Sequence, residues 1–164
     1  MTGHDWAPPG AYTVRLVADG KIYTQPLRLV LDPRVKTPAS AMAQVATLSR
    51  EMYDGAVALR AAYVTARAMS DRLTSASDAA LKSRIDSIAP APTRGARPGF
   101  GFRQAPSGPP TLESVRAAMM AAAMAMQGAD VAPTAREVDA VTKARAQYKD
   151  VMARWSALAA KQLD

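Results

Sequence analysis

Hydrophobic and polar positions follow two different periods, and the period of two near the N-terminus predicts β structure. Over residues 10–31, two runs rich in β-branched and aromatic residues flank Asp19-Gly20. This dipeptide favours a type I′ turn, because both turn positions need positive φ. The pattern predicts an antiparallel hairpin with Val17 opposite Ile22 and Tyr12 opposite Leu27.

One face of the predicted hairpin is mainly apolar. Pro26 falls opposite Thr13 at a non-hydrogen-bonded pair, so its missing N–H costs the hairpin nothing. The second run extends beyond its partner to Leu31. A lone hairpin is marginal in water, so we expect a cover, either the apolar positions of residues 45–73 or parts of a longer chain. The face to be covered carries Tyr12, Val14, Leu16, Tyr23 and Leu27.

From Thr37 onward the apolar positions recur every three or four residues, which predicts amphipathic helices. Thr37-Pro38, Thr111 and Thr134 with Glu137 are helix-start signals. The predicted helices span about residues 38–73, 78–88, 111–127 and 133 to the C-terminal end. In the first helix the predicted buried positions are Val45, Leu48, Met52, Leu59, Ala62, Ala66, Met69 and Leu73, with Gly55 in one slot.

These elements together predict a mainly α fold, an antiparallel bundle of three main helices and one short helix with an N-terminal β-hairpin. The hairpin occupies residues 7–33 and the bundle residues 37–164, with a Pro/Gly-rich loop at 90–110. Short connections make the last two helices antiparallel neighbours, so the first helix supplies the third wall. Gly55 marks either a close approach of a neighbour or a weak point in the first helix.

Composition limits the chemistry. Hydrophobic residues make up 49% of the 164-residue chain, much of it Ala and Met, and aromatic residues 5%. There is no cysteine, which excludes disulfides and thiolate metal sites. The net charge is +7, but the basic residues are scattered among acids at helical spacing, typical of solvated helix faces. No segment reaches the ~18 apolar residues of a membrane span.

No catalytic, cofactor-binding or metal-binding residues are predicted. His4 is the only histidine and has no acidic partners at ligand spacing. Carboxylate pairs occur at Glu51 with Asp54 and at Glu137 with Asp139. We interpret the acids as surface ion-pair members, since Lys143 follows Asp139 by four residues and Arg154 follows Asp150 by four.

Two surfaces are candidates for partner contact. The glycine-rich loop carries Arg94, Arg97, Phe100, Phe102 and Arg103, which suit base stacking and phosphate contact. A linker whose phenylalanines pack on the bundle is the favoured interpretation of that loop. The second surface is Met120 and Met124, beside the predicted buried positions Met119 and Met126.

A family resemblance covers about thirty residues, WAPPGAYTVRLVADGKIYTQPLRLVLDPRV. This stretch resembles the end of an Ig-like β-sandwich that follows a β-propeller in bacterial BNR-repeat or sortilin-like proteins, often labelled glycosyl hydrolases. The order PPG-x-Y-T-V-R-L, D-G-K, T-Q-P-L, D-P-R-V carries the match, and the A-P-T helix start resembles the helical tail of that family.

The resemblance implies a non-catalytic C-terminal accessory region, as a fragment of a longer chain, with the propeller or the Ig-like domain as its partner. It implies no site residues, because the S-x-D-x-G-x-T-W propeller pattern is absent here. It also suggests export to the periplasm or outside the cell, although MTGHDWAPPG lacks an apolar signal core. The alternatives are a stand-alone helical interaction module acting as a homodimer, or a weak basic nucleic-acid binder through residues 94–103.

Overall fold

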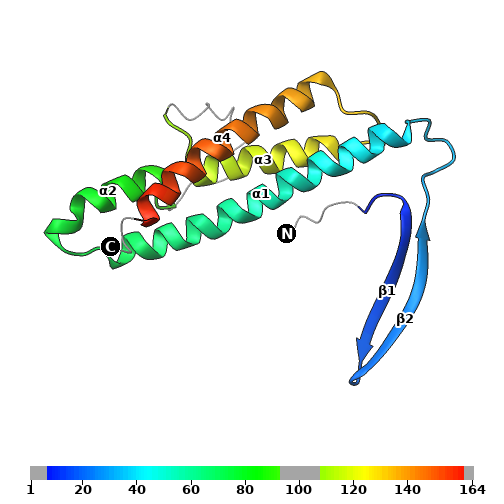
Figure 1. Ribbon diagram of the computed structural model, residues 1–164, viewed down its shortest axis with the longest axis horizontal. Helices are drawn as coiled ribbons and strands as arrows, with labels where there is room; N and C mark the ends of the chain where they lie inside the picture. The colour runs from blue at the N-terminus through cyan, green and yellow to red at the C-terminus, as the bar shows by residue number, and fades with distance from the viewer. Residues whose placement is uncertain (1–6, 93–107, 161–164) are drawn as a thin grey trace.

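The computed structural model describes residues 7–92 and 108–160, and within them it confirms the predicted mainly helical bundle with an N-terminal hairpin (Figure 1). Strands β1 (Gly10–Ala18) and β2 (Lys21–Leu29) precede α1 (Ala39–Arg72). A short 3-10 turn, η1 (Ala76–Asp78), leads into α2 (Ala79–Ile88), and α3 (Leu112–Met126) and α4 (Ala135–Ala160) complete the described chain. None of these helices is long and apolar enough to cross a membrane.

The hairpin has the predicted turn and register. Asp19 and Gly20 have φ values of 51° and 72°, as a type I′ turn requires. Val17 pairs with Ile22, Tyr12 with Leu27 and Thr13 with Pro26. One expectation is wrong: β2 does not outlast β1, since both strands have nine residues. A longer ladder would place Pro8 opposite Leu31 at a hydrogen-bonded pair, and proline has no N–H to donate.

The hairpin projects away from the helices (Figure 1). Leu16 is 59% exposed, Tyr23 54% and Leu27 44%. The expected cover by the apolar positions of residues 45–73 is therefore wrong. That helical stripe is already occupied by α3 and α4, and it cannot bury a second layer at the same time.

The segment between hairpin and bundle is held by one local contact and one long-range contact. Asp32 accepts a backbone bond from Arg34 at 2.9 Å, and its carboxylate pairs with the Arg34 guanidinium. The Thr37 hydroxyl donates to the carbonyl of Asp130 at 2.5 Å, which ties the start of α1 to the α3–α4 connection. Thr37 is thus not the N-cap that the sequence predicts; Pro38 stands there without a side-chain cap.

The core lies between α1, α3 and α4, with α1 and α3 packed antiparallel along much of their length (Figure 1). Small residues on α1 permit this close approach. A Cβ built on Gly55 would lie 2.9 Å from Sδ of Met119 and closer still to its Cε, so this glycine marks close approach rather than a weak point. Leu48, Met69 and Leu73 are only partly buried. The buried residues of α1 are Val45, Ser49, Met52, Ala56, Leu59, Ala62, Ala66 and Ser70.

A polar network docks α2 on the end of α1. The Arg67 guanidinium lies 2.6 Å from the Asp86 carboxylate, and the buried Ser70 hydroxyl donates to the same oxygen at 2.7 Å. Lys82 Nζ donates to the carbonyl of Ser70 at 2.7 Å, and this oxygen also accepts from the backbone N–H of Leu73 at the C-terminus of α1. Lys82 of α2 therefore binds backbone carbonyls at the C-terminal end of α1.

The starts of α3 and α4 follow their sequence signals. Thr111 and Ser114 form a reciprocal capping box at α3. At α4 the Glu137 carboxylate accepts from the Thr134 N–H at 2.7 Å, and the Thr134 hydroxyl accepts from the Glu137 N–H at 3.3 Å. These caps fix where α3 and α4 begin, and the two helices pack against each other as an antiparallel pair (Figure 1).

The core assignment predicts a large difference between two positions of α1. Leu59 is fully buried, whereas Val64 is 52% exposed. We expect Leu59→Ala to lower the free energy of unfolding by about 2–5 kcal/mol through lost burial and a residual cavity. Val64→Ala should stay within about 0.5 kcal/mol of the original chain. Urea unfolding followed by circular dichroism measures both, and equal losses would contradict the helix orientation described here.

Candidate functional site

The hairpin is the largest concentration of exposed apolar side chains in the described residues. Seven of the eleven large hydrophobic side chains that are exposed lie on it or directly after β2. Monomeric proteins rarely leave such a patch uncovered without an interaction reason. We call it the hairpin surface; it comprises Val14, Leu16, Val17, Ile22, Tyr23, Leu27 and Val30.

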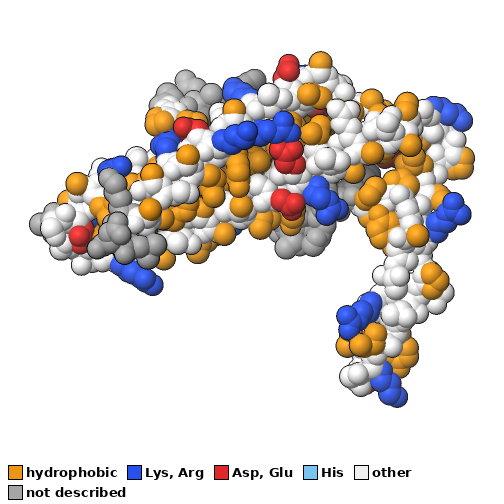
Figure 2. Space-filling view, in the orientation of Figure 1, with side chains coloured by type: hydrophobic (Ala, Val, Ile, Leu, Met, Phe, Trp, Pro, Cys, Tyr) orange, Lys and Arg blue, Asp and Glu red, His pale blue; other side chains and the backbone are white. Residues whose placement is uncertain are grey.

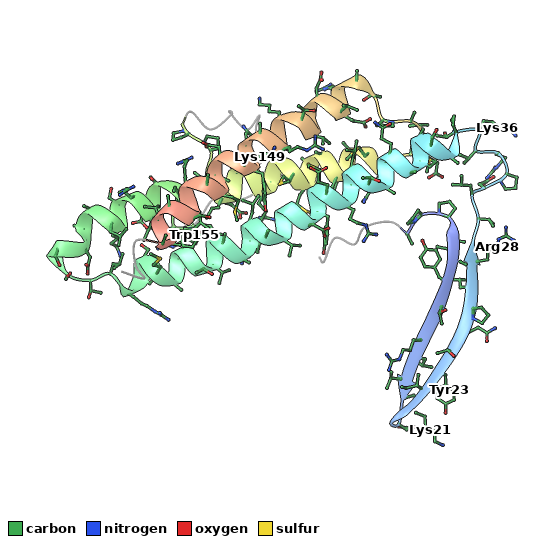
Figure 3. The ribbon with its side chains drawn as sticks, in the orientation of Figure 1. Lys21, Tyr23, Arg28, Lys36, Lys149 and Trp155 are labelled. Atoms are coloured by element: carbon green, nitrogen blue, oxygen red, sulfur yellow. The ribbon has the colours of Figure 1, made fainter. Side chains whose placement is uncertain are left out.

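The hairpin surface is apolar on both faces towards its tip. Leu16 and Tyr23 form a cross-strand pair on one face, and Val17 and Ile22 form the next pair on the other. Figure 3 places Tyr23 and Lys21 at the far end of the hairpin, away from the helices. The prediction from the sequence assigned the apolar surface to a single face, although Val17 and Ile22 already indicated a second one.

Basic side chains accompany this apolar surface. Residues 10–36 contain five basic and two acidic residues. One of the acids, Asp32, is already paired with Arg34 at 2.6 Å. Figure 2 shows blue and orange side chains along the hairpin. Its apolar and cationic character together favours a partner that offers apolar and acidic side chains.

The predicted methionine surface is only partly available. Met119 and Met126 are buried, as predicted. Met124 is 67% exposed on α3, but Met120 packs against the core and is half-buried. The two side chains therefore do not form one exposed patch, and only Met124 is fully presented to solvent.

The predicted loop surface lies outside the described residues. Arg94, Arg97, Phe100, Phe102 and Arg103 belong to residues 93–107, and His4 belongs to residues 1–6. The candidate nucleic-acid contact at this loop therefore stays a prediction.

Three of the carboxylates singled out in the sequence, Glu51, Glu137 and Asp150, have structural partners. Glu51 does not face Asp54 across a cleft; its carboxylate makes a two-pronged pair with Arg145 of α4, at 2.6 and 2.7 Å. Asp150 lies 3.4 Å from Arg154, which confirms that predicted surface pair. Glu137 caps α4. The Glu51–Arg145 pair joins α1 to α4 and was missed, because the two residues lie 94 positions apart.

Hydrogen bonds favour the charged state of three carboxyl groups, those of Glu51, Glu113 and Asp86. The hydrogen bond from Arg145 lowers the pKa of Glu51, and the bond from Arg116 lowers the pKa of Glu113. The Ser70 hydroxyl, followed by Arg67, lowers the pKa of Asp86. A general acid needs the opposite shift. Glu51 and Asp86 instead join two helices, whereas Glu113 pairs with Arg116 within α3.

A small pocket lies where the hairpin meets the bundle. Its volume is about 190 Å³, and it is lined by Pro8, Val30, Met42 and Met126 among others. Ser49 also lines it; its hydroxyl is buried and has no hydrogen-bond partner among the described residues. The hairpin base and the bundle are thus loosely packed at this joint.

The described residues contain no group of three or more His, Asp or Glu side chains placed to hold a metal ion. Comparison of the chain with protein-family models, with curated proteins and with solved structures gives no match. The resemblance to the propeller-associated proteins therefore stays a hypothesis, and the hairpin surface is the candidate site.

The lowered pKa values predict an acid-sensitive bundle. A carboxyl whose pKa is lower in the folded chain stabilises it above the unfolded-state pKa, and this contribution is lost as the pH falls through the folded-state pKa. We expect the free energy of unfolding to fall as the pH is lowered from neutrality into and below the ordinary carboxyl range. Chemical unfolding at several pH values measures this dependence.

The variant Glu51→Gln measures how much of this pH dependence comes from the Glu51–Arg145 pair. It should cost about 0.2–1 kcal/mol at neutral pH, the usual range for a partly exposed pair, and should cost less in acid. Asp139→Asn removes one negative charge at an exposed position and is the control. Equal pH profiles for Glu51→Gln and the original chain would show that the Arg145 pair contributes nothing.

Proposed function

We propose that this chain is a non-catalytic, C-terminal accessory region of a BNR-repeat or sortilin-like propeller protein, whose hairpin joins β structure outside these residues. The observation that supports it is the exposed hairpin surface. A two-stranded hairpin is marginal in water and needs a third strand or a packing layer. The helices of this chain do not supply that layer.

The bundle fits the role of a self-sufficient terminal module. Its apolar stripes face inward and are closed by α1, α3 and α4. Polar contacts, including Glu51 with Arg145, fix the helices to one another. The bundle thus holds the hairpin at one end, while the hairpin offers the apolar surface that remains.

Self-association through the hairpin surface is the competing function. Dimerisation through the helical stripes has little support, because the buried residues of α1 already contact α3 and α4. Two copies would also bring together chains of net charge +7. Light scattering separates these ideas: a mass near 17.3 kDa is expected, and a clean dimer at micromolar concentration would favour self-association.

The first test concerns the gene. We expect the reading frame upstream of Met1 to continue into propeller repeats with the S-x-D-x-G-x-T-W pattern, followed by an Ig-like domain. A ribosome-binding site directly before Met1, with no coding sequence upstream, would overturn the accessory-region proposal.

The second test concerns the hairpin surface in that longer protein. Leu16→Glu introduces a charge at the hairpin surface and should raise amide exchange across β1 and β2 by about tenfold or more, because the covering layer no longer binds. Val64→Glu changes a similarly exposed valine of α1 and should leave hairpin exchange unchanged. A hairpin that exchanges freely in the original longer protein would contradict the proposal.

A further inference from the structure

The two outer edges of the hairpin differ in their capacity to accept another strand. In an antiparallel pair, residues at hydrogen-bonded positions point their N–H and C=O groups at each other, and the alternate residues point them outward. Pro26 has no N–H, and it pairs with Thr13 inside the continuous ladder. The Thr13–Pro26 pair is therefore a non-hydrogen-bonded one, and this fixes the pattern of the whole hairpin.

The outer edge of β1 is complete. The outward-facing residues of this strand are Ala11, Thr13, Arg15 and Val17, and each has both an N–H and a C=O to offer. No helix covers this edge, since the strand is exposed except for half-buried Tyr12 (Figure 1). An uncovered strand edge of this kind is a ready template for strand addition.

The outer edge of β2 is interrupted. Its outward-facing residues are Ile22, Thr24, Pro26 and Arg28. Pro26 stands near the middle of that row, where it removes a donor and places its ring in the path of an incoming strand. Proline on an edge strand is a known means of blocking edge-to-edge pairing. The sequence thus blocks one edge of the hairpin and leaves the other open.

We propose that β1 is the joining edge, and that it accepts a strand of the β domain that precedes this chain in the longer protein. This inference rests on the proposed function. An added strand places alternate side chains beside Tyr12, Val14 and Leu16 on one face and beside Thr13, Arg15 and Val17 on the other. The accepted strand therefore carries apolar residues on the first face and an acidic or polar residue beside Arg15 on the second.

The charge of the edge favours this occupant over a second copy of the chain. Arg15 has no carboxylate partner among the described residues, and neither has Arg28 on the neighbouring strand. An antiparallel β1–β1 pair centred on Val14 would place Arg15 of one copy opposite Thr13 of the other, so it would supply no acid. A strand with glutamate or aspartate beside Arg15 satisfies the cation and the edge together.

The test uses two substitutions, one to proline and one from proline, and neither removes a hydrogen bond between β1 and β2. Thr13→Pro removes an outward N–H from β1, just as Pro26 does on the opposite strand, without removing a bond between β1 and β2. Pro26→Thr restores the missing donor on β2 and is the matched control. Slow exchange of the Tyr12 and Val14 amides in each variant verifies that the hairpin itself has formed.

The probe is a capped nine-residue peptide of alternating valine and glutamate, matched to the nine residues of β1, and binding is measured by fluorescence anisotropy. We expect it to bind the full chain, and Thr13→Pro to weaken binding by about tenfold or more through loss of main-chain pairing. Pro26→Thr should bind at least as well as the original chain. The same peptide with lysine in place of glutamate should bind at least about tenfold more weakly.

Each other outcome overturns the inference. No binding at millimolar peptide, equal binding by Thr13→Pro, or a preference for the lysine peptide would show that β1 is not an acceptor of this kind. A dimer that Thr13→Pro dissociates would assign the edge to a second copy. If the hairpin is protected in the longer protein but Thr13→Pro leaves that protection unchanged, the edge is wrong and the accessory function stands. A hairpin unprotected in the longer protein removes both.

Discussion

The close packing of α1 against α3 is the constraint on which the rest of the structure depends. Gly55 lets the two helices approach, since Met119 fills the space that a side chain at residue 55 would occupy, and the buried small residues Ala56, Ala62 and Ala66 lie on the same helix. The apolar side chains of α1 form a single stripe along an amphipathic helix. Because α3 and α4 occupy the stripe of α1, the hairpin receives no cover from the bundle.

As a result, the side chains of the apolar stripes of the bundle are buried, whereas those of the hairpin surface are exposed. The bundle is closed by fully buried side chains such as Leu59 and Val151, and by ion pairs that link its helices. The hairpin relies on its turn and its own ladder. The Thr37 bond to Asp130 fastens the end of the linker next to α1 to the bundle, and the strands extend outward from there.

The sequence predicted features that depend on neighbouring residues. Asp19-Gly20 determines the turn and register, and the Thr134–Glu137 capping box marks the start of α4, since each signal acts over a few residues. Contacts between residues far apart in the chain, such as Glu51 with Arg145, could not be predicted from the sequence. Periodicity identified a stripe on α1 but placed Leu48 and Met69 inside, whereas Ser49 and Ser70 are buried. Serine tolerates burial there because small side chains permit helix contact, and for Ser70 because Asp86 accepts its hydroxyl. Periodicity also does not indicate whether the apolar stripe of α1 packs against the hairpin or against α3 and α4.

Two prolines determine where the hairpin ladder ends and which of its outer edges is open to another strand. Pro8 ends the ladder at its base, because it cannot donate opposite Leu31, and Val30 and Leu31 then turn towards the pocket beside Met42. Pro26 closes the outer edge of β2 at no cost to the pairing with Thr13. Proline on the outer edge of β2 prevents edge-to-edge pairing on that side, whereas the outer edge of β1 keeps its donors. The hairpin is therefore asymmetric: the outer edge of β2 is interrupted at Pro26, and the outer edge of β1 keeps its outward-facing backbone groups at Thr13 and Arg15.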